Sequence, residues 1–200
     1  TGPTNVAPEW APAGRTVLLG IGRLHPQKGF DRLLPIFQRL RSSHPDWHLV
    51  LLGEGDERIR LEAQVQDLGL QQHVSLPGWV ADVEGALSRS DLFVLPSRYE
   101  GFGNVVAEAL ACGVPVVTMD CPSGPGEIVR DGVDGFIVPA DDTSRLEQVL
   151  DQVMGDAQLR DQFSARGPEV LDRFSEQKFL AQWDAVLEGN SESEVDAILA

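Results

Sequence analysis

The sequence has little cysteine and little lysine, with two of each among its 200 residues. Cys112 and Cys121 could pair, but one disulfide would be a thin framework for a chain of this length. We therefore expect reduced thiols and a cytoplasmic protein. Neither C-x-x-C nor H-E-x-x-H occurs, which leaves no recognisable zinc or haem site. No run of about eighteen apolar residues is free of charge, Gly and Pro, so we expect no membrane-spanning helix.

Positive charge is also scarce, because 16 Lys and Arg face 31 Asp and Glu and leave a net charge of −15. Duplex DNA and anionic membrane surfaces are bound through cationic patches. The charge therefore excludes nucleic-acid binding and polybasic membrane anchoring as the main activity of this chain. The hydrophobic fraction of 42% is enough to bury the core of one full domain.

Predicted strands alternate with predicted helices along most of the chain. The apolar runs predict strands at residues 16–22, 47–52, 74–76, 92–95, 114–119 and 135–138. The helical spacing of apolar residues predicts helices at residues 30–41, 54–68, 80–88, 104–112, 127–130, 143–154, 156–174 and 176–187. This alternation is typical of an α/β fold with a doubly wound, Rossmann-like parallel sheet and helices on both faces. Such sheets bind ligands at the carboxyl ends of their strands.

The two ends of the chain differ from this pattern. Residues 1–14 carry three prolines without periodicity and are expected to be an interdomain linker, which fits a chain that begins with Thr1 as a piece of a longer protein. Residues 15–188 are expected to form the domain. Residues 189–200 are expected to be a frayed acidic tail.

The loop after the first strand contains two cations. A dinucleotide fingerprint G-x-G-x-x-G that starts at Gly20 and Gly22 would need a third glycine where His25 stands, and no phosphate loop of the G-x-x-x-x-G-K type occurs. Arg23 and Lys28 lie in this loop and are suited to neutralising a diphosphate. A solvated surface arginine and lysine is an equally good explanation of this stretch taken alone.

The loop after the fourth strand is glycine-rich and leads into a helix. The first-turn amides of Val105 to Ala107 lack intrahelical partners, which predicts an anion site at the start of this helix. Gly101 and Gly103 allow the backbone to approach a ligand closely.

Two carboxylates flank this turn. Glu108 belongs to a helix that is otherwise apolar, so we expect it to be buried and to need hydroxyl or amide donors. Glu100 precedes the same helix. Together they suit a ligand that carries a diphosphate between two hydroxyl-rich rings. The alternative is that Glu100 is a turn residue and Glu108 pairs with an arginine from a neighbouring helix.

These residues resemble a known family. The Gly22-Arg23-Leu24 and Lys28-Gly29 segments, followed by Glu100 and Glu108, are similar to the retaining glycosyltransferases of family four, and in particular to the C-terminal, donor-binding half of their GT-B fold. Further segments that match start at Gly78, Ala111, Ser123 and Asp131. The resemblance extends from about Thr16 to Leu187.

The resemblance implies a role for each matching position. Arg23 and Lys28 would bind the diphosphate and stabilise the leaving nucleoside diphosphate, and Glu100 would bind the hydroxyls of the donor sugar. Glu108 would hold the ribose. The backbone near the phosphates, the sugar and the base would come from Gly22, Gly53, Trp79, Val80, Phe102, Gly103, Asn104 and Val105. The sequence contains no strict D-x-D motif, which agrees with the metal-independent GT-B pattern, so we expect no metal and no cofactor beside the nucleotide-sugar substrate.

The resemblance also implies a partner, because family members carry an N-terminal acceptor-binding domain that nothing here matches. We expect the lone half to bind donor weakly and to transfer little, in bacterial polysaccharide or glycolipid synthesis, with membrane association only through the absent domain. One alternative is a non-catalytic nucleotide-binding or regulatory module. Another is an NAD(P)-binding domain, against which His25 argues. His44, His48 and His73 are expected to have surface or packing roles, and Trp47, Trp183 and the phenylalanines to lie in the core.

Overall fold

The computed structural model describes residues 14–121 and 124–187. Its six strands form one sheet in the order β3-β2-β1-β4-β5-β6, and every neighbouring pair is parallel. The strands are β1 (Thr16–Ile21), β2 (Trp47–Leu52), β3 (Val74–Gly78), β4 (Leu92–Leu95), β5 (Val116–Met119) and β6 (Gly135–Val138). The predicted fold class, a doubly wound parallel sheet, is confirmed.

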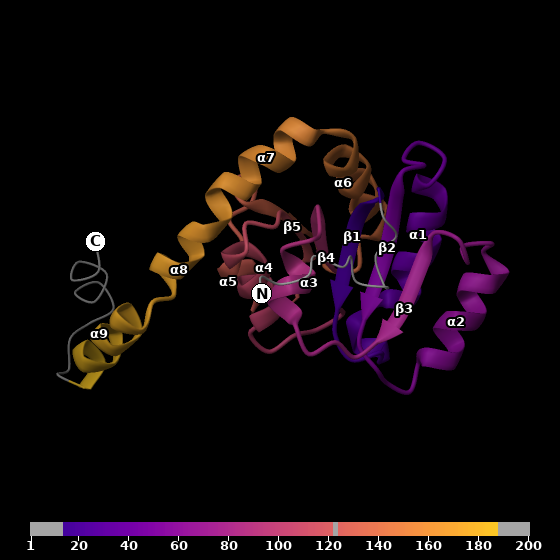
Figure 1. Cartoon of the computed structure of the whole chain (residues 1–200). Helices are drawn as coiled ribbons and strands as arrows, with labels where there is room; N and C mark the ends of the chain where they lie inside the picture. Colours follow the sequence, from indigo (N-terminus) through magenta and orange to yellow (C-terminus); the bar gives the residue numbers. More distant parts are fainter. Residues whose placement is uncertain (1–13, 122–123, 188–200) are drawn as a thin grey trace, which may run out of the picture.

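Helices cover both faces of this sheet (Figure 1). Buried residues of α1 (Phe30–Leu40), α2 (Arg58–Asp67) and α6 (Thr143–Gly155) pack against one face. Buried residues of α3 (Val83–Leu87), α4 (Asn104–Ala111), α5 (Pro125–Ile128) and α8 (Val170–Arg173) pack against the other. Successive residues of a strand point to opposite faces, so Leu18 joins the first core and Leu19 the second. Because both faces are covered, most strand positions are apolar, and β4 is apolar throughout.

The chain changes direction between β1 and β4, the two central strands. From β1 the chain proceeds through α1 to β2 on one side, and from β4 it proceeds through α4 to β5 on the other. The loops that follow β1 and β4 therefore meet at the carboxyl edge of the sheet. This is the position at which doubly wound sheets bind ligands.

The helix predicted at residues 54–68 starts later, as α2 at Arg58. The segment before it runs against the loop after β1, where Leu24 N–H donates to the Glu54 carbonyl at 2.8 Å and Glu57 N–H donates to the Leu24 carbonyl at 3.0 Å. A Cβ atom on Gly53 would lie 2.0 Å from the carbonyl oxygen of Gly22. This close approach of two backbones prevents the segment from coiling into the helix that its sequence predicts.

The single helix predicted at residues 156–174 is three elements: α7 (Ala157–Arg166), the 3-10 helix η2 (Gly167–Glu169) and α8. Pro168 lacks the N–H that an α-helix requires there. A Cβ on Gly167 would lie 2.7 Å from the Leu110 carbonyl oxygen, which shows how closely this break packs on α4. The break redirects the chain toward α9 (Glu176–Leu187), which runs away from the sheet (Figure 1).

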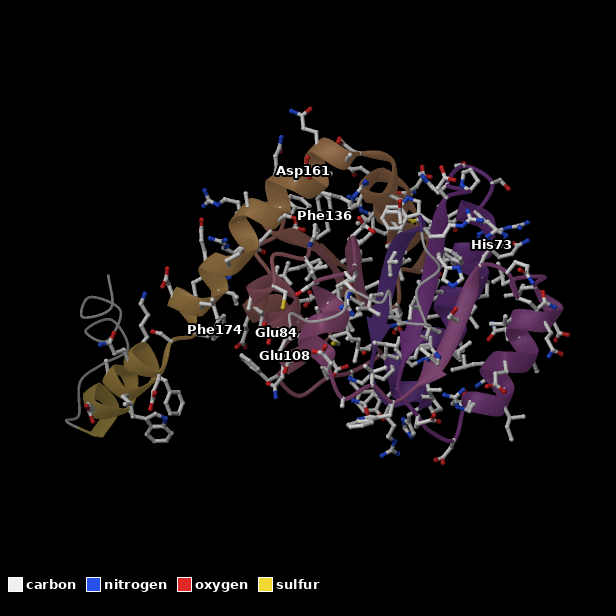
Figure 2. The ribbon with its side chains drawn as sticks, in the orientation of Figure 1. His73, Glu84, Glu108, Phe136, Asp161 and Phe174 are labelled. Atoms are coloured by element: carbon white, nitrogen blue, oxygen red, sulfur yellow. The ribbon has the colours of Figure 1, made fainter. Side chains whose placement is uncertain are left out.

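The aromatic side chains near the end of the described chain are not in the core. Trp183 is 52% exposed, and Phe179, which lies beside it on α9, is 58% exposed. The prediction of a core position is wrong for Trp183 and Phe179, because α9 extends beyond the layer that could cover them. It is also wrong for Phe102 and Phe174, which are exposed. Phe174 lies where α8 passes into this extension (Figure 2). Its ring packs edge-on against that of Phe102, with the ring centroids 5.6 Å apart. Trp47 is buried, as predicted.

The terminal predictions lie almost entirely outside the described residues. This holds for residues 1–13 of the predicted linker and for the whole predicted tail at 189–200. None of the helices between residues 14 and 187 is long and apolar enough to cross a membrane.

Candidate functional site

The loops after β1 and β4 are joined by a hydrogen bond between main-chain groups and by another from a side chain to the main chain. Arg98 N–H donates to the Gln27 carbonyl at 2.7 Å, and the Gln27 side-chain amide donates to the Tyr99 carbonyl at 2.9 Å. Gln27, which makes both contacts, belongs to the 3-10 turn η1 (Pro26–Lys28). His25 caps this turn, since its Nδ1 accepts a hydrogen bond from Gln27 N–H at 3.2 Å. The two loops thus form one unit at the carboxyl edge of the sheet.

Arg32 of α1 connects this unit to the body of the domain. Its guanidinium donates to the Pro96 carbonyl at 2.7 and 2.9 Å and to the Ser97 carbonyl at 2.8 Å. Gly29 starts the same helix with φ of +69°, and a Cβ atom there would lie 2.0 Å from the Pro96 carbonyl oxygen. The close approach of η1 to the end of β4 therefore requires glycine at this position.

An ion pair with two hydrogen bonds closes the outer side of the unit. Arg98 donates to both carboxylate oxygens of Asp31, at 2.8 and 2.9 Å. Burial alone would raise the pKa of Asp31, but the hydrogen bonds and charge of Arg98 outweigh it and lower the pKa. The carboxylate is therefore charged at neutral pH. A guanidinium that donates to both oxygens of a carboxylate fixes the orientation of the pair and adds hydrogen bonding to the charge attraction.

Lys28 and Glu100 meet inside this unit. Lys28 Nζ lies 2.6 Å from Glu100 Oε1, and their side chains are only 17% and 7% exposed. Ser97 Oγ donates to the same carboxylate oxygen, also at 2.6 Å. The alternative in which Lys28 is a solvated surface lysine does not apply.

Arg23 is exposed and makes no ion pair within residues 14–121 and 124–187. It lines a hollow of about 360 Å³ together with Lys28 and Glu100. The remaining walls are Ile21, Gly22, Gly101, Phe102, Gly103, Asn104 and Val105. The structure thus brings both predicted cations, Glu100 and the start of α4 to one cavity.

The start of α4 offers backbone amides to this hollow. Gly103 has no side chain to cap the helix, and within the described residues no other side chain accepts a hydrogen bond from its first N–H groups. Val106 N–H does have a partner, because it donates to the Gly103 carbonyl at 2.8 Å. The prediction that the amides of Val105 to Ala107 all lack intrahelical partners is wrong for Val106, because its N–H bonds the carbonyl three residues earlier. A helix start without a side-chain cap favours a bound anion.

A second hollow of about 320 Å³ adjoins the first and shares Ile21, Gly22 and Arg23 with it. Gly53, Trp79 and Val80 line it, as do Leu52, Glu54 and Val83. The Trp79 ring is 75% exposed, and Arg58 holds the Glu54 carboxylate by hydrogen bonds of 2.7 and 2.8 Å. An exposed indole beside backbone and aliphatic walls suits a flat aromatic ring.

Glu108 is exposed, so the prediction that it is a buried carboxylate is wrong. Only one face of α4 is buried, formed by Val106, Ala109 and Leu110 at spacings of three and four residues. Glu108 lies on another face and pairs with no arginine in the part of the chain that the structure describes. The prediction failed because it treated every apolar residue of the helix as buried, whereas small residues such as Ala111 are only partly covered.

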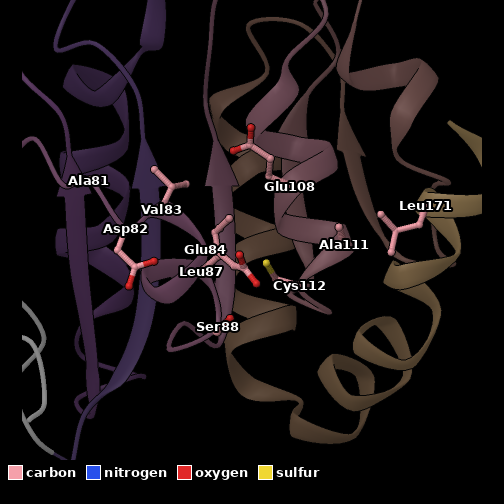
Figure 3. A pocket seen from close by; sticks show the side chains of 10 residues that line it. All are labelled: Ala81, Asp82, Val83, Glu84, Leu87, Ser88, Glu108, Ala111, Cys112 and Leu171. Carbon is pink, nitrogen blue, oxygen red and sulfur yellow. The ribbon is translucent and has the colours of Figure 1, made fainter. Parts of the chain in front are cut away.

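Glu108 lines a third hollow, of about 730 Å³, between α3, α4 and α8 (Figure 3). Glu84 and Cys112 face one another in this hollow, and Leu171 lies on its far side. The third hollow shares Val83 with the second. The residues predicted from the sequence therefore line three hollows that share wall residues, with Glu100 in the first and Glu108 in the third.

The two cysteines are free thiols. Burial raises the pKa of Cys112, and the nearby carboxylates of Glu84 and Glu108 raise it further. Burial, followed by the charge of Glu100, likewise raises the pKa of Cys121. Both thiols therefore remain protonated at neutral pH, which disfavours a cysteine nucleophile. Within the described residues, no group of three or more His, Cys, Asp or Glu side chains is arranged to hold a metal ion.

Sequence reasoning did not single out the residues that join the two loops. Gln27, Asp31, Arg32, Ser97 and Arg98 act on partners 64 to 72 positions away in most of these contacts. No local pattern marks such partners. The proximity of Ser97 to Glu100, three residues apart, was the one signal available.

A doubly wound sheet with cavities at its switch point is typical of nucleotide-binding α/β domains. The chain matches the family of glycosyl transferases group 1 over residues 4–170. It is 36% identical over 160 residues to the lipopolysaccharide core biosynthesis glycosyltransferase LpsE of Rhizobium meliloti, covering 80% of this chain and 46% of that protein. It is 34% identical over 183 residues to an exopolysaccharide phosphotransferase of Streptomyces coelicolor, covering 91% of this chain and 19% of that one.

Solved structures give the same result. HepE of Anabaena in complex with UDP and glucose has a TM-score of 0.78 and 27% identity, covering 88% of this chain and 49% of that chain. The C-terminal domain of LpcC, a glycosyl transferase group 1 family protein of Francisella tularensis, has a TM-score of 0.71 and 26% identity, covering 79% and 85%. The chain therefore belongs to the glycosyl transferases group 1 family, as the C-terminal, donor-binding half of a GT-B fold. It spans less than half the length of the curated relatives named above.

Proposed function

We propose that this chain is the donor half of a retaining glycosyltransferase, which moves a sugar from a nucleoside-diphosphate sugar to an acceptor hydroxyl. The single observation that carries the proposal is the cavity in which Arg23, Lys28 and Glu100 face the uncapped start of α4. Two cations and free amides suit a diphosphate, and a carboxylate beside them suits sugar hydroxyls. LpsE, with its role in lipopolysaccharide core synthesis, supports assembly of a bacterial polysaccharide or glycolipid as the pathway.

The chemistry assigned to this cavity is departure of the nucleoside diphosphate. As the bond between the sugar and the diphosphate breaks, positive charge develops on the sugar ring and negative charge on the leaving oxygen. Arg23, Lys28 and the amides at the start of α4 would stabilise the leaving group, in the way that preorganised donors stabilise developing charge. We propose that these protein groups suffice without a metal ion.

The two ends of the donor are assigned to the flanking residues. Glu100 would accept hydrogen bonds from the donor sugar, and the amides near Phe102, Gly103 and Asn104 would assist it. Glu108 would bind the ribose hydroxyls, and its exposure leaves its oxygens accessible to them. The base would lie in the second hollow beside Trp79. UDP is the first nucleotide to test, because HepE was solved with UDP and glucose.

A partner is needed for transfer. Because the chain spans less than half of LpsE, we propose that a second domain binds the acceptor and contributes further groups to the reaction. The isolated chain would then bind donor and transfer little. We also propose a cytoplasmic location, with any membrane contact made by the second domain.

Calorimetric titration tests the proposal. Wild-type chain is titrated with UDP, GDP, UDP-glucose, UDP-N-acetylglucosamine, GDP-mannose and NADH. We expect binding of at least one nucleoside diphosphate and its sugar, and none of NADH. Binding of NADH without any sugar nucleotide would overturn the proposal.

A second measurement separates the enzyme from a non-catalytic nucleotide-binding module. The chain is mixed with the acceptor-binding half of the same protein, and sugar transfer from the donor that it binds is followed. Transfer that appears only in the mixture supports the enzyme, whereas donor binding without transfer in the mixture favours the regulatory module. An Arg23→Met chain serves as the matched control, because it should fold normally and yet lose transfer.

A further inference from the structure

The carboxylate of Glu100 is held at only one of its two oxygens. Ser97 Oγ and Lys28 Nζ both lie 2.6 Å from Oε1. Across residues 14–121 and 124–187, Oε2 accepts no hydrogen bond from the protein. These described residues therefore orient the carboxylate through Oε1 and leave Oε2 available to a ligand in the cavity that Glu100 lines.

Ser97 itself has little freedom to move. It is 1% exposed, and its carbonyl accepts a hydrogen bond from Arg32 at 2.8 Å. The preceding residue, Pro96, has a fixed φ and accepts two further hydrogen bonds from the same guanidinium. Because the main chain on both sides of the hydroxyl is fixed, the Ser97 side chain is a rigid support for Glu100.

Lys28 is a less permanent partner. Its side chain is long and carries a charge, and it lines the same cavity as Arg23 and the start of α4. A diphosphate carries more negative charge than one carboxylate, so its arrival would draw the ammonium away from Glu100. The neutral hydroxyl of Ser97 experiences no comparable attraction. After this exchange Ser97 is the remaining protein donor to Oε1.

From this geometry we infer that Ser97 is a positioning residue for sugar recognition. It keeps the Glu100 carboxylate oriented, with Oε2 available to a hydroxyl of the donor sugar, once Lys28 has turned to the diphosphate. The inference rests on the proposed function, because it presupposes a nucleoside-diphosphate sugar in the cavity. It adds a residue that acts on the sugar and not on the nucleotide.

The test compares ligands with and without the sugar. Calorimetry gives the dissociation constants of wild type, Ser97→Ala and Ser97→Thr for UDP and for UDP-glucose, or for the diphosphate and sugar that wild type prefers. We expect Ser97→Ala to keep the affinity for UDP within about twofold. It should weaken UDP-glucose binding about tenfold, the effect expected from losing a hydrogen bond to a charged group. Ser97→Thr keeps the hydroxyl and should restore most of the loss.

A double-mutant cycle distinguishes positioning from a merely structural role. On a Glu100→Gln background, Ser97→Ala should cause no further loss of UDP-glucose affinity, because the group it orients is already altered. Ser90→Ala is the matched control, since it removes a serine hydroxyl bonded to α3 carbonyls away from Glu100. We expect Ser90→Ala to bind both ligands as wild type does.

The outcomes separate the two proposals. If wild type binds no sugar nucleotide, the proposed function fails and Ser97 loses its assigned role with it. If wild type binds UDP-glucose and Ser97→Ala binds it equally well, only the role of Ser97 fails. Equal weakening of UDP and UDP-glucose by Ser97→Ala, or a full additive loss on the Glu100→Gln background, would show that the serine supports the loop as a whole.

Discussion

The ammonium group of Lys28 lies 2.6 Å from the carboxylate of Glu100, although 72 positions separate the two residues in the chain. Both side chains are largely buried, so solvent and salt screen their attraction only weakly. The charge of Lys28 is therefore already balanced by the protein. Arg23, exposed in the same cavity, provides the positive charge that an approaching diphosphate would meet first.

The two cations should consequently differ in their effect on stability. Lys28→Met leaves the carboxylate of Glu100 without its ion-pair partner and should lower the free energy of unfolding by roughly 2 kcal/mol, less than for a fully buried pair. Arg23→Met removes an exposed charge and should change it by no more than about 0.5 kcal/mol. Urea unfolding measures both, and both variants should weaken UDP binding.

The only other lysine provides the control for this comparison. Lys178 is exposed on α9, so Lys178→Met should leave both stability and UDP binding at wild-type values. Equal unfolding free energies for the Lys28→Met and Lys178→Met chains would contradict a stabilising role for the pair of Lys28 and Glu100.

The two carboxylates should differ in the ligands that they affect. Glu108→Ala should weaken UDP and UDP-sugar alike, because ribose is common to both. Glu100→Ala should weaken only the sugar-bearing ligand, because it removes the sugar contact and also releases Lys28 toward the phosphates. Calorimetric dissociation constants for both ligands check the prediction. The assigned roles are wrong if each variant affects both ligands to the same extent.

Gly29 should tolerate no side chain, because a Cβ atom there would overlap the Pro96 carbonyl. Gly69 makes a matched control, since its φ of +66° is close to the +69° of Gly29 and nothing lies within 4 Å of its Cβ position. Gly69→Ala therefore reports the cost of the backbone conformation alone. We expect Gly29→Ala to cost about 2 kcal/mol more than Gly69→Ala in urea unfolding. Similar costs for the two variants would mean that the loops separate easily.

His48 should make stability depend on acid pH. It is 3% exposed, its Nε2 is 2.8 Å from Ser75 Oγ, and its Nδ1 has no hydrogen-bond partner among the described residues. Burial, followed by the charges of His73 and Arg15, lowers the pKa of His48 from 6.5 to about 4. Because the folded value is the lower one, its contribution is complete above pH 6.5 and is lost as the pH falls toward 4.

His48→Gln removes this titration and keeps a group that can bond Ser75. Between pH 7 and pH 4, wild type should lose roughly 2–3 kcal/mol more unfolding free energy than the variant. Urea unfolding at several pH values measures the difference, and the remaining acidic and basic groups cancel in the comparison. Parallel pH profiles for the two chains would show that the ring is not buried in its neutral form.

Local sequence accounts for the secondary structure where one periodicity dominates. The apolar runs of β1, β2 and β4 and the spacing in α1 were predicted closely, because a strand covered on both faces and a helix with one apolar stripe each leave a distinct pattern. The start of α2 and the break between α7 and α8 were predicted incorrectly. Both depend on close backbone contacts with distant segments, which override local preference.

The sequence by itself determined the alternation of strands and helices, the parallel sheet and the two loops that carry the cations and carboxylates. These follow from the period of hydrophobic residues and from glycine and proline positions, which are local properties. Only the tertiary structure decided that Lys28 pairs with Glu100, that Ser97 holds the same oxygen and that Glu108 is exposed. Such contacts depend on where two distant loops come to lie and on which face of a helix finds a neighbour, and neither is encoded within a few residues.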